Sequence, residues 1–251
     1  MSHNPLIIAL DVDDAAQARD LIGKLGHSVD FYKIGMELYA AAGLEFVREV
    51  VGAGKQVFLD LKLYDIGETV KRAVAVVAPA GVRFLTVHGS SAVMRAAVEG
   101  RGDTGLQILA VTVLTSFDQQ DIADLGYEMP LSDLVALRAR RALACGMDGI
   151  VCSPLDAAAV RVIVGPKTIL VTPGVRSKSA ASGDQKRVAT PAEAIAAGAN
   201  YLVIGRQVTR AADPKAEVER IQEEIVARSS YEDGHELPAT SYEPRATASV
   251  P

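Results

Sequence analysis

Eight short apolar runs alternate with alanine-rich amphipathic segments along most of the chain, and this alternation constrains the fold more than any other sequence feature. Each run is nearly continuous in Val, Ile, Leu and Phe, which is typical of strands buried on both faces of a parallel sheet. The predicted strands are residues 6–12, 31–36, 56–62, 84–89, 107–114, 149–153, 168–174 and 201–205.

Amphipathic helices are predicted between the strands, for example over residues 14–25, 132–145 and 190–199, each opening with Asp, Ser or Thr as an N-cap. An open doubly wound sheet would normally carry a GxGxxG turn after its first strand. Here the first strand runs into LDVDDAAQ, which contains no glycine. The sequence therefore predicts an α/β protein with a single (β/α)8 TIM barrel over residues 1–228. Residues 229–251 lack apolar periodicity and are predicted to form a flexible extension.

Composition restricts the function classes. The 251 residues are 49% hydrophobic, enough for a sizeable core, and the net charge of -5 argues against a nucleic-acid partner. No apolar run is long enough to span a bilayer, and the first residues lack the features of a signal peptide. Cys145 and Cys152 stand outside any zinc-type spacing and are expected to be reduced thiols. We therefore expect a cytoplasmic protein that binds a small molecule, without a membrane partner.

Polar residues lie at the predicted carboxyl end of every strand, where (β/α)8 barrels place their active sites. No comparable set lies at the opposite ends. The residues at the carboxyl ends are Asp11, Lys33, Asp60, Lys62, Asp65, His88, Thr115, Ser116, Ser153, Arg176, Gly205 and Arg206.

Asp60 and Lys62 interrupt the otherwise apolar strand VFLDLKL. Charged groups at strand ends often form only weak surface pairs. However, residues two apart on a strand point to the same face, and buried charges are costly unless paired. We therefore expect Asp11, Lys33, Asp60, Lys62 and Asp65 to form one mutually compensating cluster that keeps Lys62 protonated.

A phosphate site is expected after the last two strands, as in many barrels of this type. Gly205 allows close backbone approach, and Arg206 can donate two charge-assisted hydrogen bonds to phosphate oxygens. The long polar segment between Pro173 and Thr190 is predicted to be a closing lid, with Arg176 contacting phosphate and Gln185 the base. The alternative for that segment is a disordered loop. His88 could be a general acid, but a single His at a strand end is as often a packed or hydrogen-bonded support, and we favour that role. No transition-metal ligand set is present.

Seven motifs in order resemble the orotidine 5'-monophosphate decarboxylase family over roughly residues 5–227. The decisive motif is the DxKxxD pattern of residues 60–65. The supporting motifs are LDVD (10–13), YKIGMEL (32–38), VTVLTS (111–116), VTPGVR (171–176), GDQKR (183–187) and VIGR (203–206).

The resemblance implies decarboxylation of orotidine 5'-monophosphate to UMP, without metal or cofactor, in a homodimer with shared active sites. Lys62 would protonate the carbon that loses carbon dioxide. The other implied roles are ribose and carboxylate contacts (Asp11, Lys33, Asp60), the neighbouring subunit's site (Asp65, Thr69), backbone contacts (Ile66, Thr69), the pyrimidine (Thr115, Ser116) and the phosphate and lid (Arg176, Gln185, Gly205, Arg206).

Tyr64, Gly67 and Glu68 depart from the family's usual His, Pro and Asn, which loosens the turn and adds negative charge. Two alternatives follow from other uses of such a barrel. Magnesium-dependent sugar-phosphate enzymes of the same superfamily share DxKxxD, but they carry a metal-binding Glu where this chain has Lys33. A non-catalytic barrel that binds a phosphorylated metabolite is the other alternative, and retention of Lys62 with its flanking acidic residues argues against it.

Overall fold

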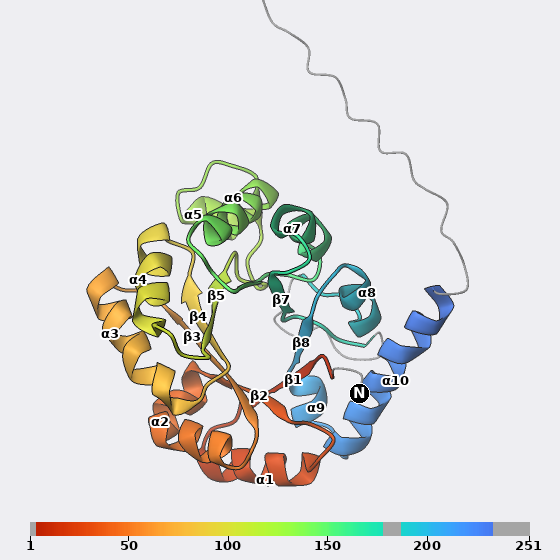
Figure 1. The fold of residues 1–251 in the computed structure, drawn as a ribbon. Coiled ribbons are helices and arrows are strands. Elements are labelled where there is room, and N and C mark those ends of the chain that lie inside the picture. Colours follow the sequence, from red (N-terminus) through yellow and green to blue (C-terminus); the bar gives the residue numbers. More distant parts are fainter. Residues whose placement is uncertain (1–3, 178–186, 233–251) are drawn as a thin grey trace, which may run out of the picture.

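Eight parallel strands close into a barrel in the computed structural model, which describes residues 4–177 and 187–232. Each strand pairs with the next along the chain, and the last pairs with the first, so the predicted (β/α)8 barrel is confirmed (Figure 1). The strands are β1 (Leu6–Ala9), β2 (Phe31–Gly35), β3 (Gln56–Leu63), β4 (Phe84–His88), β5 (Gln107–Val111), β6 (Gly149–Val151), β7 (Ile169–Thr172) and β8 (Tyr201–Ile204).

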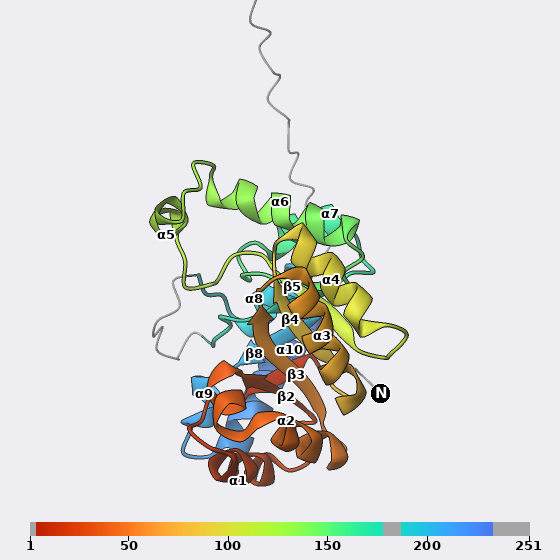
Figure 2. The ribbon, with the colours of Figure 1, turned by 90° about the vertical axis from the view of Figure 1, so that its left-hand side faces the viewer.

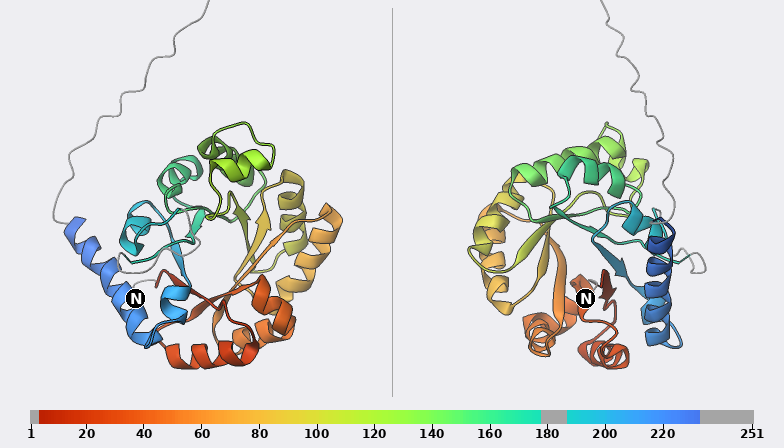
Figure 3. Two further views of the ribbon diagram at one scale, coloured as in Figure 1. Left: turned by 180° about the vertical axis from the view of Figure 1, so that it is seen from behind. Right: turned by 45° about the vertical axis from the view of Figure 1, so that its right-hand side comes forward.

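The helices form a ring around the strands, which is also visible from behind (Figures 1 and 3). They are α1 (Ala15–Leu25), α2 (Met36–Gly52), α3 (Gly67–Val77), α4 (Ser91–Arg101), α5 (Gln119–Asp124), α6 (Leu131–Ala144), α7 (Ala157–Val164), α8 (Pro191–Ala196), α9 (Arg206–Thr209) and α10 (Pro214–Glu232), with a 3-10 turn η1 (Ala78–Ala80). Among the described residues, no helix combines the length and apolarity that crossing a membrane requires.

Two of the predicted N-caps are correct and one is wrong. Asp14 accepts hydrogen bonds from the first turn of α1, and Thr190 forms a capping box with Glu193 at α8. Ser132 does not cap α6, which begins one residue earlier, at Leu131. The reason is a tertiary contact: the Gln119 side chain accepts from the Leu131 backbone N–H at 2.8 Å and replaces a local cap.

The last helix, α10, continues to Glu232, past the predicted domain boundary at residue 228. Starting a helix is costly, but adding residues to the end of an existing one costs little, so α10 extends into the segment that lacks apolar periodicity. The first residues of the extension predicted over 229–251 therefore belong to α10, and its remaining residues, 233–251, lie outside the described part of the chain.

The core has two layers. Side chains from alternate strand positions fill the barrel interior, and a larger cluster lies between the sheet and the helices. At the amino end, the Arg83 guanidinium stacks over Phe31, Phe84 and Tyr201 and donates a hydrogen bond to the Tyr201 hydroxyl. The interior is therefore filled at that end.

Several strands end earlier than predicted at their carboxyl ends. The predicted first strand extended to residue 12, the fifth to 114 and the sixth to 153, whereas β1, β5 and β6 end at Ala9, Val111 and Val151. The polar residues that follow therefore lie on loops at the barrel mouth. The mouth is the side on which α5 and α9 lie in Figure 2, because these helices follow β5 and β8.

Candidate active site

A cavity of about 430 Å³ opens at the carboxyl ends of the strands. It brings together residues that are far apart in the sequence and come from different strands and loops. The sequence-predicted residues that line it are Asp11, Lys33, Asp60, Lys62, Thr115, Ser116, Arg176, Gly205 and Arg206.

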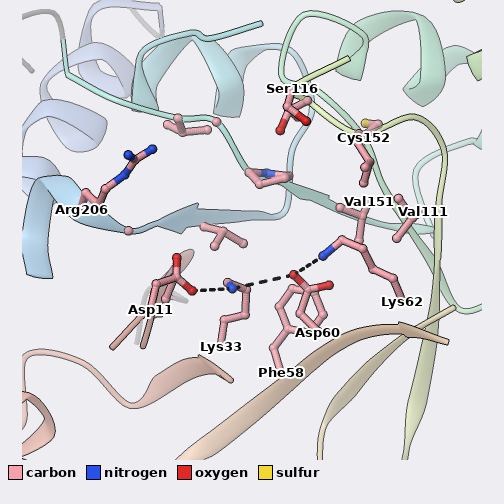
Figure 4. A pocket seen from close by; sticks show the side chains of 18 of the residues that line it. Asp11, Lys33, Phe58, Asp60, Lys62, Val111, Ser116, Val151, Cys152 and Arg206 are labelled. Carbon is pink, nitrogen blue, oxygen red and sulfur yellow. Dashed lines mark hydrogen bonds and ion pairs between the residues drawn. The ribbon is translucent and has the colours of Figure 1, made fainter. Parts of the chain in front are cut away.

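Four charged side chains form a row of alternating sign along one wall (Figure 4). Lys33 Nζ lies 2.9 Å from Asp11 Oδ1 and 3.8 Å from Asp60 Oδ2. Lys62 Nζ lies 2.9 Å from the same Asp60 oxygen. Each charge in the row therefore has an opposite charge beside it, which offsets part of the desolvation free energy of these partly buried groups.

The backbone of β3 is irregular between Asp60 and Lys62. Leu59 pairs with Leu85 and Leu63 with Val87, so β3 carries extra residues in this interval. Lys62 has a φ of 48°, the one positive value outside glycine in the described residues. The predicted contact between Asp60 and Lys62 is present. It arises from a bulge that contains a left-handed residue, whereas the sequence analysis assumed a regular strand with alternating side chains.

Thr86 of β4 fixes this bulge, and sequence reasoning missed it. Its fully buried hydroxyl donates to Asp60 Oδ1 at 2.9 Å and accepts from the Lys62 backbone N–H at 3.0 Å. The only signal in the sequence was a single hydroxyl within an apolar strand. The sequence does not reveal its role, because the hydroxyl of β4 binds residues of a different strand, β3.

Asp60 is ionised despite its burial. Loss of hydration raises the pKa of this carboxyl, but the ammonium groups of Lys33 and Lys62 and hydrogen bonds from Lys62 and Thr86 outweigh that effect. The net result is a pKa below its usual value. The wall of the cavity therefore presents a fixed carboxylate between two ammonium groups.

Two glycines leave room for this row. A Cβ at Gly35 would lie 3.0 Å from Lys33 Nζ, and one at Gly205 would lie 3.5 Å from Asp11 Oδ2. Gly35, which the sequence prediction did not include, is therefore a position where a side chain would press on the central ammonium.

Two guanidinium groups, those of Arg176 and Arg206, also line the cavity. Arg206 lies on the Asp11 side of the row, at the end away from Lys62 (Figure 4). Burial lowers the pKa of Arg176, and the positive charge of Arg206 lowers it further. The two cations are therefore close enough to repel each other, which makes this end of the cavity favourable for an anion. Gln185, expected beside them, lies outside the described residues, as does most of the predicted lid.

Apolar side chains also line the cavity, several of them on the side of Lys62 (Figure 4). They include Phe58, Val111, Val151, Val203 and Cys152. Burial, helped by the charge of Asp156, raises the pKa of the Cys152 thiol to about 12, against the opposing effect of nearby arginines. Cys152 is therefore a neutral lining residue at pH 7, not a thiolate nucleophile.

Three predicted residues do not reach this cavity. Asp65, Ile66 and Thr69 lie on the exposed segment after β3, and Asp65 accepts a hydrogen bond from the Ile66 backbone N–H at 2.6 Å. The expected five-residue cluster therefore contains four members within this chain. Glu68, one of the departures from the family motif, pairs with Arg72 on the same helix at 3.6 Å.

His88 stands beside the site and does not line it. Its ring lies 5.4 Å from that of Tyr64, centroid to centroid. Burial, Arg138 and Lys62 all lower its pKa, so the ring is neutral at pH 7. Within the described residues, no group of three His, Cys, Asp or Glu side chains could hold a metal ion.

Fold and site together define a (β/α)8-barrel protein with a row of lysines and carboxylates and two arginines at the barrel mouth. Comparison with known proteins then gives the family. The chain belongs to the orotidine 5'-phosphate decarboxylase / HUMPS family, whose sequence model matches residues 4–221. The resemblance seen in the sequence motifs is thereby confirmed.

Similar proteins carry consistent names. An orotidine 5'-phosphate decarboxylase of Rhodopseudomonas palustris (strain HaA2) is 57% identical over 220 residues, 88% of this chain and 94% of the relative. One from Methylorubrum extorquens (strain PA1) is 51% identical, with the same coverage. The crystal structure of orotidine 5'-phosphate decarboxylase from Lactobacillus acidophilus superimposes with a TM-score of 0.79 at 34% identity, covering 89% of this chain and 99% of that one.

Proposed function

We propose that this protein is a carboxy-lyase that converts orotidine 5'-monophosphate to UMP, the last step of de novo pyrimidine nucleotide synthesis. The observation that carries the proposal is the row Asp11–Lys33–Asp60–Lys62 in a cavity that is also lined by two arginines. This arrangement offers fixed positive charge at a reacting carbon and a separate site for a phosphate. We place the reaction in the cytoplasm, where the pathway's soluble intermediates would be available.

The substrate would lie across the cavity with its phosphate at Arg176, Gly205 and Arg206. Guanidinium groups suit this role because they form bidentate, charge-assisted hydrogen bonds with phosphate oxygens. Thr115 and Ser116, which line the cavity, would contact the pyrimidine. The ribose and the scissile carboxylate would face the charged row. Gln185 is proposed to complete the phosphate and base contacts.

The chemical step breaks the bond between C6 of the pyrimidine and its carboxylate. Carbon dioxide leaves, and the bonding electron pair stays on C6 in the plane of the ring, where π-delocalisation cannot spread it. The Lys62 ammonium stabilises that charge electrostatically and then transfers a proton from Nζ to C6, which gives UMP. Lys62 regains a proton from solvent, so the cycle needs no oxidant and no external electron sink.

Asp60 and Lys33 prepare the site for this step. A carboxylate that stays ionised beside the substrate carboxylate repels it, and departure of carbon dioxide relieves the repulsion. Asp60 also orients the Lys62 ammonium at 2.9 Å. Lys33 and Lys62 together balance the charges of Asp11 and Asp60, so the row carries no net charge of its own.

Lys33 also distinguishes this site from that of a magnesium-dependent sugar-phosphate enzyme. Its Nζ lies between the carboxylates of Asp11 and Asp60, where it would repel a divalent cation. To test the substrate, the protein is incubated with orotidine 5'-monophosphate and, separately, with 3-keto-L-gulonate 6-phosphate, and products are identified by mass spectrometry. UMP from the first and no product from the second is expected. Decarboxylation of the sugar phosphate alone would contradict the proposal, and binding without turnover would favour a non-catalytic barrel.

A homodimer with two shared sites would explain the positions of Asp65, Ile66 and Thr69. These residues lie outside their own chain's cavity, on a segment where the apolar side chains Tyr64 and Ile66 are 70% and 76% exposed. A two-fold axis beside this segment would bury those side chains and place Asp65 and Thr69 in the partner's site, and the exchange would be reciprocal.

Subunit mixing tests the shared site. Inactive Lys62→Ala and Asp65→Asn proteins are dissociated, mixed and reassociated, and subunit exchange is verified with differently tagged chains. Random pairing makes about half of the dimers hybrids with one intact site each, so about a quarter of wild-type activity should return. If Asp65 acts within its own chain, every site keeps one defect and mixing restores nothing.

A further inference from the structure

Two arginines hold the segment that leads from β5 to the cavity. The backbone carbonyl of Thr112, directly after β5, accepts a hydrogen bond from Arg138 of α6. The carbonyls of the next two residues, Val113 and Leu114, accept from Arg187 Nη2 at 3.4 and 3.1 Å. Three consecutive carbonyls are therefore bound by guanidinium groups in a stretch that the sequence predicted to be strand.

This stretch ends at Thr115 and Ser116, which line the cavity. Thr112 still donates its backbone N–H to the Val151 carbonyl of β6 at 3.0 Å, and this is the last contact of the strand ladder among the described residues of the segment. Beyond Thr112, the carbonyls of Val113 and Leu114 accept from Arg187, and the Leu114 carbonyl also accepts from the Phe117 N–H at 3.0 Å. The Arg187 contacts therefore act on the two residues that directly precede Thr115 and Ser116.

Arg187 also ties this segment to the loop after β6. Its Nη1 forms an ion pair with Asp156, and the two side chains are only 11% and 16% exposed. The Ser153 hydroxyl donates to the carbonyl of Arg187 at 3.5 Å. Arg187 is not among the residues that line the cavity, so it lies behind the cavity wall and joins the segments after β5 and β6.

We propose that Arg187 is a positioning residue that fixes Thr115 and Ser116 for contact with the pyrimidine of the substrate. The inference rests on the proposed function, because it assumes that these two residues face a base. Arg187 would not touch the substrate. Substituting Arg187 would therefore weaken binding of the base and leave binding of the phosphate unchanged.

The geometry requires arginine at this position. One planar guanidinium gives Nη1 to the Asp156 carboxylate and Nη2 to two carbonyls, so its donors diverge in a fixed fork. A lysine has a single nitrogen and can keep the ion pair only by giving up one or both carbonyls. Arg187→Lys should therefore fold and retain its charge while releasing the segment that carries Thr115 and Ser116.

Arg161 offers a matched control. It is likewise a carbonyl-binding arginine: its guanidinium donates to the backbone carbonyls of Gly165, Thr168 and Gly198. These acceptors lie in the turns that precede β7 and β8, at the amino end of the barrel and away from the cavity. Arg161→Lys removes the same kind of interaction without affecting Thr115 and Ser116.

The experiment compares ligands with and without a base. Dissociation constants of UMP and of ribose 5-phosphate are measured by calorimetry for the wild type, Arg187→Lys and Arg161→Lys, together with kcat and KM for orotidine 5'-monophosphate. In Arg187→Lys the Kd of UMP should rise about tenfold, the size expected when a hydrogen bond to the base is lost, while that of ribose 5-phosphate changes less than about twofold. In Arg161→Lys the ratio of the two constants should stay at the wild-type value.

Three outcomes would overturn the inference. Arg187→Lys could leave UMP affinity unchanged, it could weaken both ligands equally, or Arg161→Lys could shift the ratio as much as Arg187→Lys does. Each would show that Arg187 has only a general structural role or none. Lack of turnover in the wild type is a separate result that would refute the proposed function, and the UMP comparison still tests the positioning role.

Discussion

Lys62 Nζ lies 2.9 Å from Asp60 Oδ2 while the Lys62 backbone adopts a φ of 48°. A left-handed conformation in a residue other than glycine costs on the order of 1–2 kcal/mol and persists only where surrounding contacts impose it. Here the contacts are Thr86 on the backbone N–H and Asp60 on the ammonium. These two contacts hold the strained backbone of Lys62 and fix the position of its Nζ atom.

Replacing Lys62 by Ala should lower kcat for orotidine 5'-monophosphate by at least about 10⁴-fold, because both the electrostatic stabilisation and the proton donor are lost. UMP should still bind, since the arginine end of the cavity is intact. Turnover is followed spectrophotometrically and binding by calorimetry. Near-normal kcat in a folded variant would remove Lys62 from the catalytic step.

Comparing Lys62→Gly with Lys62→Ala isolates the backbone strain. Both variants lack the ammonium, but glycine adopts a positive φ without steric cost, so the glycine variant should be more stable by about 1 kcal/mol. Urea denaturation measures the difference. An alanine variant as stable as the glycine one would indicate that the chain relaxes out of the bulge.

Arg206→Ala should weaken UMP binding by roughly 1.5–3 kcal/mol, as expected for losing charge-assisted hydrogen bonds to phosphate. Uridine, which has no phosphate, should bind the variant and the wild type with equal, low affinity. Calorimetry with both ligands makes the comparison. Equal losses for the two ligands would assign Arg206 a structural role.

His88 should make folding sensitive to mild acid. Its folded-state pKa lies below the usual 6.5, because of burial first and then Arg138 and Lys62. The unfolded chain therefore binds this proton more readily, so the stability contributed by neutral His88 is present above pH 6.5 and declines as pH falls through the interval below it. Wild type should lose more stability than His88→Gln between pH 6.5 and 5. Parallel pH profiles in urea denaturation would contradict this.

The barrel and much of the site could be predicted because both follow from local patterns. Apolar runs marked strands buried on both faces, and polar residues directly after them had to gather at one end of the barrel. The same pattern predicts that Asp11, Lys33, Asp60 and Lys62 lie together, as they do in the structure.

What the sequence could not reveal depends on contacts between distant segments. The sequence does not show what Thr86 and Arg187 bind, since their partners lie on other strands and loops, although Arg187 belongs to one of the family motifs. The same holds after β5, where the carbonyls of residues 112–114 accept hydrogen bonds from Arg138 and Arg187, which lie on other segments. Asp65 was expected in the cluster, but it is exposed in the single chain. Its proposed role is therefore in the active site of a partner subunit.

The most direct test of the account is the initial rate at which the wild-type protein consumes orotidine 5'-monophosphate in excess EDTA, measured by absorbance. The account predicts rapid conversion to UMP at the same rate with and without EDTA, because the Lys33 and Lys62 ammonium groups supply the positive charge of the site. Added magnesium should not increase that rate. Absence of turnover, or turnover that EDTA abolishes and magnesium restores, would contradict it.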